Sequence, residues 1–396
     1  MKYKNIGMIL DKDYPPDPRV QNEAKFLIQN GHSVSLLCID FEGKNRPEKE
    51  TIDGINIFRI KGNWLMAKFS ALAYTLPIYH FFIRHHVSRF LKQFHIDHLH
   101  VHDMPAAVGT FWANKGRLPV TLDLHENRPE IMKYYEHVNQ FPGNLLIFPK
   151  LWKKAEYRSI KKAEKVVVVT NEARDYYVKE IGVSPEKFYI APNSVLKSFY
   201  SDPKIDQEII NKYKDHFTLL YLGNTGSRRG LSTSIRSLVS LRKAIPNIKL
   251  VVVGTSKDLI DLKNLTNELD LKDHVDLLGW QDFELFPSFI KASNIGICPL
   301  HKNIHHDTTF ANKVFQYLAF GLPIIVSNCL TQQNLVEQYE CGLTFEEKNV
   351  EQFADRVLTL HRDKDLYKRY SKNAIEAIQN KLNWDIVAKD LIRLYQ

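Results

Sequence analysis

The residues whose types could bind or transform a substrate follow predicted strands. The first such loop, DKDYPPDPRVQNE, carries Asp17, Arg19 and Asn22, which could contact a polar substrate or could simply begin a helix. A second loop, within LDLHENRPE, places His125 and Glu126 directly after a β-rich run. A lone histidine is usually structural, but its position at a strand end favours a functional role for His125.

Three further histidines, His98, His100 and His102, alternate along the run HLHVH, and Asp103 follows them. This spacing puts the three side chains on one face of a strand, where they could bind a metal. The sequence offers no second group of ligands, and a strand face in a parallel sheet is ordinarily covered by a helix. We therefore expect no metal site, and no cofactor.

The loop GNTGSRRG, residues 223–230, combines glycines with two arginines before a helical pattern. Glycines such as Gly223, next to Asn224, allow a ligand to approach the backbone, and Arg228 or Arg229 can neutralise a diphosphate with directed N–H groups. The loop matches neither the dinucleotide fingerprint nor the phosphate loop of ATP hydrolases. Both nicotinamide binding and P-loop hydrolysis are therefore disfavoured.

The stretch FANKVFQYLAFGLPIIVSN, residues 310–328, predicts a helix and then a buried strand, with Gly321 as the helix cap and Pro323 as the stop. The polar run HHDTT precedes this helix. The helix N-terminus presents free N–H groups and the positive end of its dipole, and Asn312 and Lys313 add donors. An anion suits such an end. The alternative is a capped helix with a solvated lysine.

These loops need a frame that holds them, and the chain supplies a repeated alternation of strand and helix patterns. The predicted strands are residues 5–10, 32–39, 98–102, 119–124 and 165–170, and then residues 217–223, 249–254, 275–279, 295–300 and 323–327. Such alternation predicts parallel sheets covered on both faces. We expect an α/β protein with two doubly wound, Rossmann-like domains, residues 1–195 and 196–382, facing a central cleft. The helix 383–396 should pack back on the first domain.

Composition is that of a folded protein: 396 residues, 44% hydrophobic and 25% charged. The net charge of +9 favours anionic partners. Four scattered cysteines without a CxxC pair suggest reduced thiols in a cytoplasmic protein. The longest apolar stretch, residues 70–83, is interrupted by Pro77 and is shorter than the roughly 18 residues that a membrane span needs.

The combination of DPRVQNEAKFLIQNGHSVSLL, YLGNTGSRRGLSTSI and NKVFQYLAFGLPIIVSN, in this order, resembles the family-4 retaining glycosyltransferases of the GT-B fold. The resemblance implies a nucleotide diphosphate sugar as donor and no metal. It further implies that Arg229, Lys313 and the helix N-terminus bind the diphosphate, that His125 lies near the donor sugar, and that Asn193 belongs to an interdomain Pro-Asn segment. The other donor-binding residues that we expect are Gly223, Asn224, Arg228, Asp307, Thr308, Thr309, Asn312 and Gln316; those on the acceptor side are Asp17, Arg19, Asn22 and Glu126.

The sequence departs from the family pattern at Thr308 and Gln316, where the family commonly has two glutamates. Gln316 can still form hydrogen bonds with ribose hydroxyls. Thr308 lacks the charge that would stabilise a cationic transition state, although Asp307 next to it could supply one. This departure keeps open a catalytically inactive nucleotide-sugar-binding partner of another transferase. A nucleotide-sugar epimerase on the same fold is the other alternative.

The function implied is transfer of a sugar from a nucleotide diphosphate sugar to a hydroxyl of a carbohydrate or lipid-linked acceptor, with retention of configuration, in surface polysaccharide or glycolipid synthesis. We expect no nucleic-acid partner. Residues 65–94 predict an amphipathic helix that Pro77 could break in two. A further set combines Trp64, Tyr74, Ile78 and Phe81 with Lys61, Lys68, Arg84, Arg89 and Lys92. Such a set suits an anionic membrane surface, so we expect peripheral binding at the inner face of the cytoplasmic membrane.

Overall fold

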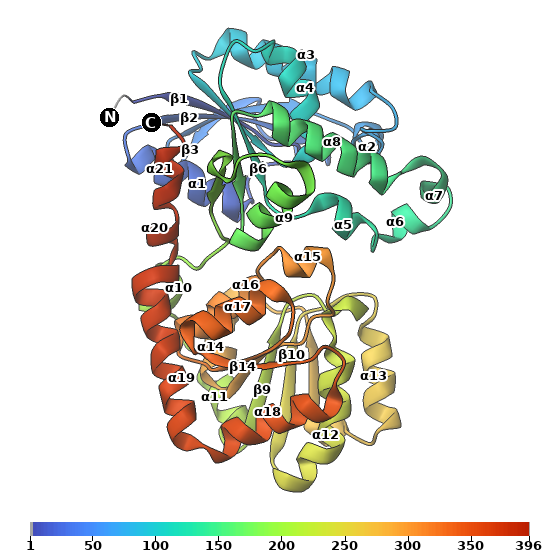
Figure 1. Ribbon diagram of the computed structural model, residues 1–396, viewed down its shortest axis with the longest axis vertical. Coiled ribbons are helices and arrows are strands. Elements are labelled where there is room, and N and C mark those ends of the chain that lie inside the picture. The colour runs from blue at the N-terminus through green and yellow to red at the C-terminus, as the bar shows by residue number, and fades with distance from the viewer. Residues whose placement is uncertain (1–2, 396) are drawn as a thin grey trace. The chain divides into compact units, whose positions relative to one another are not determined.

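The chain folds into two compact units, which the computed structural model describes over residues 3–395 (Figure 1). The first unit runs to Pro192 and also includes the segment from Ala388 onward, and the second unit is Asn193–Val387. Each unit is built on one sheet whose strands are almost all parallel, with helices in the crossover connections. The predicted α/β class with two doubly wound parallel sheets is therefore confirmed.

The sheet of the first unit has the strand order β3-β4-β2-β1-β5-β6-β7-β8. Its strands are β1 (Asn5–Ile9), β2 (Ser33–Asp40), β3 (Lys49–Ile52), β4 (Ile55–Lys61), β5 (His98–His102), β6 (Val120–Leu124), β7 (Lys165–Val168) and β8 (Phe188–Ile190). The strand order reverses between β1 and β5, and doubly wound sheets bind ligands beyond the carboxyl ends of strands at such a point. The antiparallel pair of β3 and β4 and the edge strand β8 were missed from sequence.

The helices of the first unit cover its sheet (Figure 1). They are α1 (Pro18–Gln29), α2 (Trp64–Ala71), α3 (Ile78–Gln93), α4 (Met104–Asn114), α5 (Arg128–Met132), α6 (Glu136–Asn139), α7 (Gly143–Leu146), α8 (Pro149–Lys162), α9 (Asn171–Ile181) and α21 (Lys389–Arg393). Strands β5 and β6 are buried along their whole length, so polar side chains on them face the interior.

The sheet of the second unit has the strand order β11-β10-β9-β12-β13-β14. Its strands are β9 (Phe217–Leu222), β10 (Ile248–Val253), β11 (Val275–Gly279), β12 (Ile295–Cys298), β13 (Ile324–Ser327) and β14 (Gly342–Phe345). Its helices are α10 (Ser198–Ser201), α11 (Gln207–Tyr213), α12 (Leu231–Ala244), α13 (Leu259–Glu268), α14 (Phe286–Lys291), α15 (Ile304–Asp307), α16 (Asn312–Ala319), α17 (Leu330–Tyr339), α18 (Val350–Arg362), α19 (Lys364–Ala377) and α20 (Trp384–Val387).

Helix α16 and its exit follow the sequence prediction closely. Gly321 has φ +70°, and the backbone N–H of Leu322 donates to Tyr317 O at 3.1 Å, which closes the helix end. Strand β13 then begins at Ile324, directly after Pro323. Tyr317 packs where a Cβ on Gly296 of β12 would stand, at 2.4 Å, so the small residue lets helix and sheet approach.

Two helix predictions need correction. Residues 65–94 form two helices, α2 and α3, because the chain leaves helical geometry before Pro77 and α3 starts after it. Leu65 and Leu76, which one unbroken amphipathic helix over residues 65–94 would place on its apolar, buried side, are 43% and 41% exposed. The terminal helix is likewise broken into α20 and α21, and only the segment from Ala388 belongs to the first unit.

All four cysteines, Cys38, Cys298, Cys329 and Cys341, are buried and unpaired. Among residues 3–395, no helix combines the length and the apolar character that crossing a bilayer requires.

Candidate active site

The basic loop of the second unit leads from β9 to α12 and is shaped by two glycines. Gly223 has φ +114° and Gly230 has φ +71°. A Cβ on Gly230 would stand 1.8 Å from Pro299 O, so no other residue fits there without moving the loop. Asp258 Oδ2 accepts a hydrogen bond from Ser227 N at 2.7 Å and fixes the middle of the loop. The loop is thus held in place beyond the carboxyl end of β9.

Lys313, in the first turn of α16, is only 8% exposed. Its Nζ lies 4.0 Å from the ring centroid of Tyr221 on β9, and 3.6 Å from where a Cβ of Gly223 would stand. Burial, together with the positive charges of Arg229 and Arg228, lowers the pKa of Lys313 to about 8. Within the described chain, Lys313 forms no ion pair. A buried ammonium without a carboxylate is a site for an anion from outside the protein.

Arg228 and Arg229 of the basic loop lie close enough to Lys313 for their charges to act on it. The Nε of Arg229 is buried without a hydrogen-bond partner. Arg228 Nη1 lies 3.3 Å from His306 Nε2, and burial together with both arginines lowers the pKa of His306 to about 3. His306 is therefore neutral, and the positive charge remains on Arg228, Arg229 and Lys313.

The N-terminus of α16 has no side-chain cap, because its N-cap residue is Ala311. Asn312 at the start of the helix is exposed, and Gln316 one turn later is half-buried. The uncapped end places the positive end of the helix dipole beside the buried ammonium of Lys313. This combination favours a phosphate group over a neutral ligand.

The polar residues before α16 are largely engaged with the protein itself. Thr308 Oγ donates to Ile304 O at 2.7 Å, and Asp307 Oδ1 accepts from Leu330 N at 2.8 Å. Thr309 Oγ is buried without a partner and so remains available to a ligand. Asn224 Oδ1 accepts from Gly226 N at 2.9 Å, a bond within the basic loop.

In the first unit, His125 follows β6 between two carboxylates. Its Nδ1 lies 3.3 Å from Asp103 Oδ2 and its Nε2 lies 3.3 Å from Asp123 Oδ2. Burial acts to lower the pKa of His125, but the two carboxylates outweigh it and raise the pKa to about 9. His125 is therefore an imidazolium at neutral pH and serves as a hydrogen-bond donor or a positive charge, not as a base.

Arg19 shares its partner Asp123 with His125 and is bound within the protein. Its guanidinium donates to both oxygens of Asp123, at 2.8 and 3.2 Å, and to Ala191 O at 2.8 Å, and it lies 3.0 Å from Glu23 Oε1. Burial acts to raise the pKa of Asp123, but Arg19 and His125 hold it well below its usual range. Burial raises the pKa of Glu23 to about 8. Arg19 thus organises the strand ends instead of projecting towards a substrate.

The other residues predicted on the acceptor side take different places. Asp17 caps α1 by accepting from Val20 N at 3.0 Å and forms an ion pair with Lys12 at 2.6 Å. Asn22 is half-buried on α1, and Glu126 lies 3.4 Å from Arg128. The structure therefore brings His125 and Arg19 into one network and gives Asp17 a helix-capping role.

The histidines of β5 complete this network. His100 and His102 stack with ring centroids 4.6 Å apart, His100 forms a hydrogen bond with the hydroxyl of Tyr395, and His102 Nδ1 lies 3.3 Å from Asp123 Oδ2. Ligand-type atoms of Glu23, His100, His102 and Asp123 lie within 4.8 Å of one another. Because the guanidinium of Arg19 contacts both carboxylates of this set, a divalent cation there would meet an existing positive charge. We therefore interpret the set as a hydrogen-bonded network.

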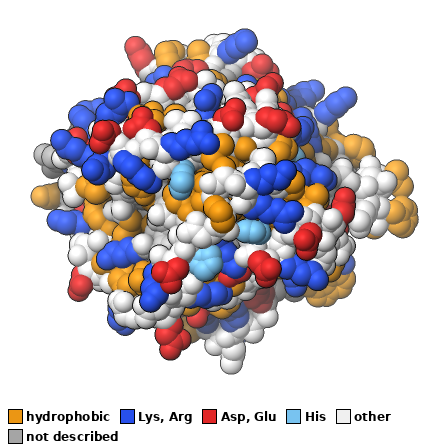
Figure 2. All heavy atoms as spheres, turned by 90° about the horizontal axis from the view of Figure 1, so that it is seen from below, with side chains coloured by type: hydrophobic (Ala, Val, Ile, Leu, Met, Phe, Trp, Pro, Cys, Tyr) orange, Lys and Arg blue, Asp and Glu red, His pale blue; other side chains and the backbone are white. Residues whose placement is uncertain are grey.

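Three residues of these two networks were missed from sequence: Asp123 and Tyr395 in the first unit, and Tyr221 in the second unit. Asp123 stands two residues before His125 and so points to the same face of the strand. Its place between the apolar Leu122 and Leu124 of β6 was the sequence feature that could have indicated it. Figure 2 shows one face of the molecule, on which Lys and Arg side chains lie among acidic and apolar ones without forming a single basic stripe. The buried Lys313 and the half-buried Arg228 and Arg229 therefore locate the anion site better than this surface does.

Each of the two units matches a known family of glycosyltransferase domains. The description "Glycosyltransferase Family 4" matches residues 19–196, and "Glycosyl transferases group 1" matches residues 202–377. The chain is 22% identical to an uncharacterised glycosyltransferase of Methanocaldococcus jannaschii over 94% of this chain and 92% of that protein. It is 24% identical to a GDP-mannose-dependent alpha-(1-6)-phosphatidylinositol monomannoside mannosyltransferase of Mycobacterium tuberculosis, over 57% of this chain and 60% of that one.

Among solved structures, the sucrose-phosphate synthase of Thermosynechococcus elongatus has the same fold, with a TM-score of 0.76 at 17% identity over 99% of this chain and 98% of that one. The basic loop and Lys313 lie in the part matched by the group 1 description, and His125 and Arg19 lie in the family 4 part. With its family 4 domain followed by its group 1 domain, the chain is a glycosyltransferase of the GT-B fold.

Proposed function

We propose that the protein transfers a sugar from a nucleotide diphosphate sugar to a hydroxyl of a carbohydrate or lipid-linked acceptor, with retention of configuration. The single observation that carries this proposal is Lys313, an ammonium that is 8% exposed, has no carboxylate partner within residues 3–395, and lies at an uncapped helix end. A diphosphate would supply the missing negative charge. The GDP-mannose dependence in the name of the mycobacterial relative supports a donor of this class.

In this proposal the second unit holds the donor. Arg229 and Lys313 stabilise the diphosphate as it leaves, which is an electrostatic role that needs no covalent nucleophile. Arg228, Gly223, Asn224, Thr309 and Asn312 line the same loop and helix end. Gln316 binds the ribose hydroxyls in this proposal, and the imidazolium of His125 takes part in the transfer step by stabilising negative charge.

Mass spectrometry of products tests this function. The protein is incubated with a panel of UDP- and GDP-sugars and with carbohydrate or lipid-linked acceptors. We expect one donor to yield an acceptor larger by one sugar, and Lys313→Met to lose most of this product. Lys263→Met, an exposed lysine on α13, is the matched control and should keep it. No product with any donor would contradict transfer.

A second candidate is a nucleotide-sugar-binding protein without catalysis. The family commonly has a glutamate where this chain has Thr308, and the hydroxyl of Thr308 donates to Ile304 O. The neighbouring carboxylate of Asp307 accepts a hydrogen bond from Leu330 N. The absence of a free carboxylate at these two positions favours this candidate. This candidate predicts tight donor binding in calorimetry with neither transfer nor donor hydrolysis.

We further propose that the protein binds peripherally to an anionic membrane surface, in surface polysaccharide or glycolipid synthesis. Trp64, Ile78 and Phe81 are 65%, 41% and 54% exposed, whereas Tyr74 is half-buried. Lys68 lies over the ring of Trp64 at 4.3 Å. Exposed aromatic residues beside lysines suit the interface of a bilayer that contains anionic lipid.

A further inference from the structure

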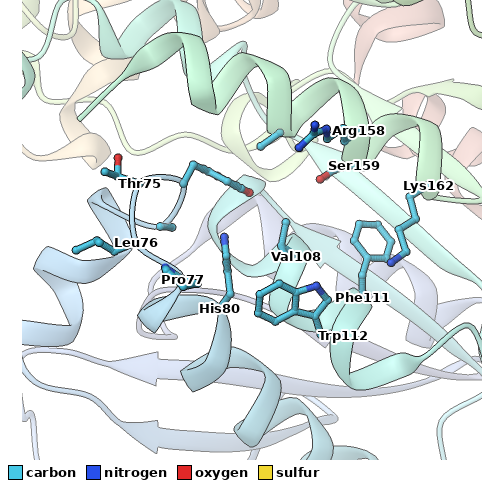
Figure 3. A pocket seen from close by; sticks show the side chains of 13 residues that line it. Thr75, Leu76, Pro77, His80, Val108, Phe111, Trp112, Arg158, Ser159 and Lys162 are labelled. Carbon is cyan, nitrogen blue, oxygen red and sulfur yellow. The ribbon is translucent and has the colours of Figure 1, made fainter. Parts of the chain in front are cut away.

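A pocket of about 420 Å³ opens within the first unit, between the turn that joins α2 to α3 and the helices α4 and α8 (Figure 3). None of the active-site residues described above lines it. The side chains that matter most are those of Leu76, His80, Phe111, Trp112, Arg158 and Lys162. These residues come from four separate elements, so the pocket is a product of the tertiary fold.

The pocket has apolar walls on some sides and a positively charged wall on another. Trp112 and Val108 of α4 lie side by side along one wall, with Leu76 and Pro77 on another (Figure 3). Arg158 and Lys162, four residues apart on α8, put two positive charges at the opposite wall. Both are exposed, and Lys162 Nζ lies 4.9 Å from the ring centroid of Phe111. Within the described chain, neither residue is paired with a carboxylate.

A buried polar group also lines the pocket. His80 is only 5% exposed, and its Nδ1 forms no hydrogen bond. A ring nitrogen of His80 points into the pocket (Figure 3). Burial lowers the pKa of His80 to about 4, so the ring is neutral and can accept or donate one hydrogen bond. An unsatisfied buried nitrogen beside a cavity indicates a polar partner that is bound there.

We propose that this pocket binds a lipid with an anionic phosphate headgroup. Arg158 and Lys162 contact the phosphate, His80 forms a hydrogen bond with the headgroup or glycerol oxygens, and the first chain carbons lie against Trp112, Val108 and Leu76. The apolar walls argue against free phosphate, which would leave them uncovered. This site does not depend on the donor chemistry of the second unit.

The surroundings of the pocket support a lipid. Leu76 lines the pocket, Ile78 follows the lining residue Pro77, and the ring centroid of Phe81 lies 5.3 Å from that of Trp112; these three side chains are 41%, 41% and 54% exposed. Thr75 Oγ donates to Leu146 O at 2.7 Å, which joins this edge to α7, where Leu145 and Leu146 are also exposed. A lipid in the pocket would therefore emerge among apolar side chains that are able to enter the bilayer interface.

Calorimetry on the full chain tests the proposal with dihexanoyl phosphatidic acid, which is monomeric at low concentration. Each charge-assisted contact to phosphate is worth roughly tenfold in affinity, so Arg158→Gln with Lys162→Gln should weaken binding at least tenfold. The matched control, Lys154→Gln with Lys161→Gln, removes the same charge from exposed positions of α8 outside the pocket and should change binding less than twofold.

Two further arms identify the ligand class. Dihexanoyl phosphatidylcholine and inorganic phosphate should bind much more weakly than phosphatidic acid. Val108→Trp should fill the pocket and abolish binding while the melting temperature stays within a few degrees. The proposal is overturned if wild-type protein gives no heat with phosphatidic acid, if inorganic phosphate displaces the lipid at equal concentration, or if the charge variant and its control bind alike.

Discussion

His125 and Asp123, two residues apart at the end of β6, form an ion pair in the interior of the first unit, with Nε2 3.3 Å from Oδ2. Asp123 is completely buried and is also bound by Arg19. The pair therefore serves two purposes: it holds the imidazole of His125 at the strand end, and it keeps that imidazole charged. Both consequences can be measured separately.

The first consequence is a pH-dependent stability. The pKa of His125 rises from 6.5 to about 9 on folding, so its contribution is fully present below pH 6.5 and is lost as the pH rises through 9. His125→Gln should lower the free energy of unfolding by on the order of 3 kcal/mol more at pH 6 than at pH 9.5. Urea unfolding at several pH values measures this difference.

The control is His95→Gln, because His95 is 84% exposed and its surface pair with Asp97 should contribute little to the free energy of unfolding. A stability difference for His125→Gln that stays constant from pH 6 to 9.5 would show that the ring is neutral in the folded protein.

The second consequence concerns turnover. His125→Ala removes a positive charge from the strand end but leaves the basic loop and Lys313 intact. We expect kcat to fall by about a hundredfold or more, with binding of the bare nucleotide diphosphate changed less than threefold. Steady-state kinetics and calorimetry give the two values. Unchanged kcat would make His125 a structural residue.

The local parts of this site were predictable from sequence and its long-range parts were not. Strands β5 (His98–His102) and β11 (Val275–Gly279) lie where their sequence patterns predicted them, because each depends mainly on its own residues. Asp123, in contrast, has its partner Arg19 at a separation of 104 residues, and His100 contacts Tyr395 across 295 residues. No local pattern encodes such pairs.

Arg19 illustrates the same limit. Its position after a strand predicted either contact with a polar substrate or the start of a helix; Arg19 stands in the first turn of α1 and turns inward. Arg19 turns inward because the buried carboxyl groups of Asp123 and Glu23 would be energetically costly without a positively charged partner. Lys313 was predicted as a diphosphate ligand from the family resemblance, but its burial follows only from the packing of α16 on β9 and β12.

Replacing Lys313 should have opposite effects on stability and on donor binding. A buried ammonium without a partner destabilises the unliganded protein, so Lys313→Met should raise the melting temperature or leave it unchanged. The same change should weaken nucleotide diphosphate binding about ten- to a hundredfold. Because the pKa of Lys313 is about 8, wild-type affinity should also decline above that pH.

Calorimetry and thermal unfolding of Lys313→Met and Lys263→Met, measured side by side, decide this prediction. Equal donor affinity in the two variants would remove Lys313 from the diphosphate site.

Gly230 predicts a steric effect on the basic loop. Gly230→Ala must place its Cβ against Pro299 O, whereas Gly182→Ala, at a similar φ of +65°, meets no atom within 4 Å. Both variants place an alanine in the left-handed backbone region, which costs both of them a similar free energy. The difference between their free energies of unfolding therefore measures the steric clash with Pro299 O. We expect Gly230→Ala to be less stable than Gly182→Ala by more than about 1 kcal/mol and to bind donor more weakly. Equal stability of both variants in urea unfolding would mean that the loop accommodates a methyl group without strain.

The exposed apolar side chains of the first unit predict binding to vesicles. Trp64 and Phe141 are 65% and 80% exposed, and each nearby basic residue contributes about 1 kcal/mol at an anionic surface. The protein should float with vesicles that contain phosphatidylglycerol at low salt and be released at high salt. Replacing Trp64 and Phe141 with Ser, or Lys68 and Arg84 with Gln, should lower the bound fraction several-fold. Trp280→Ser, which alters a 69% exposed tryptophan of the second unit, should leave it unchanged. Absence of flotation at low salt, or equal flotation of all variants, would exclude these residues as the membrane-binding surface.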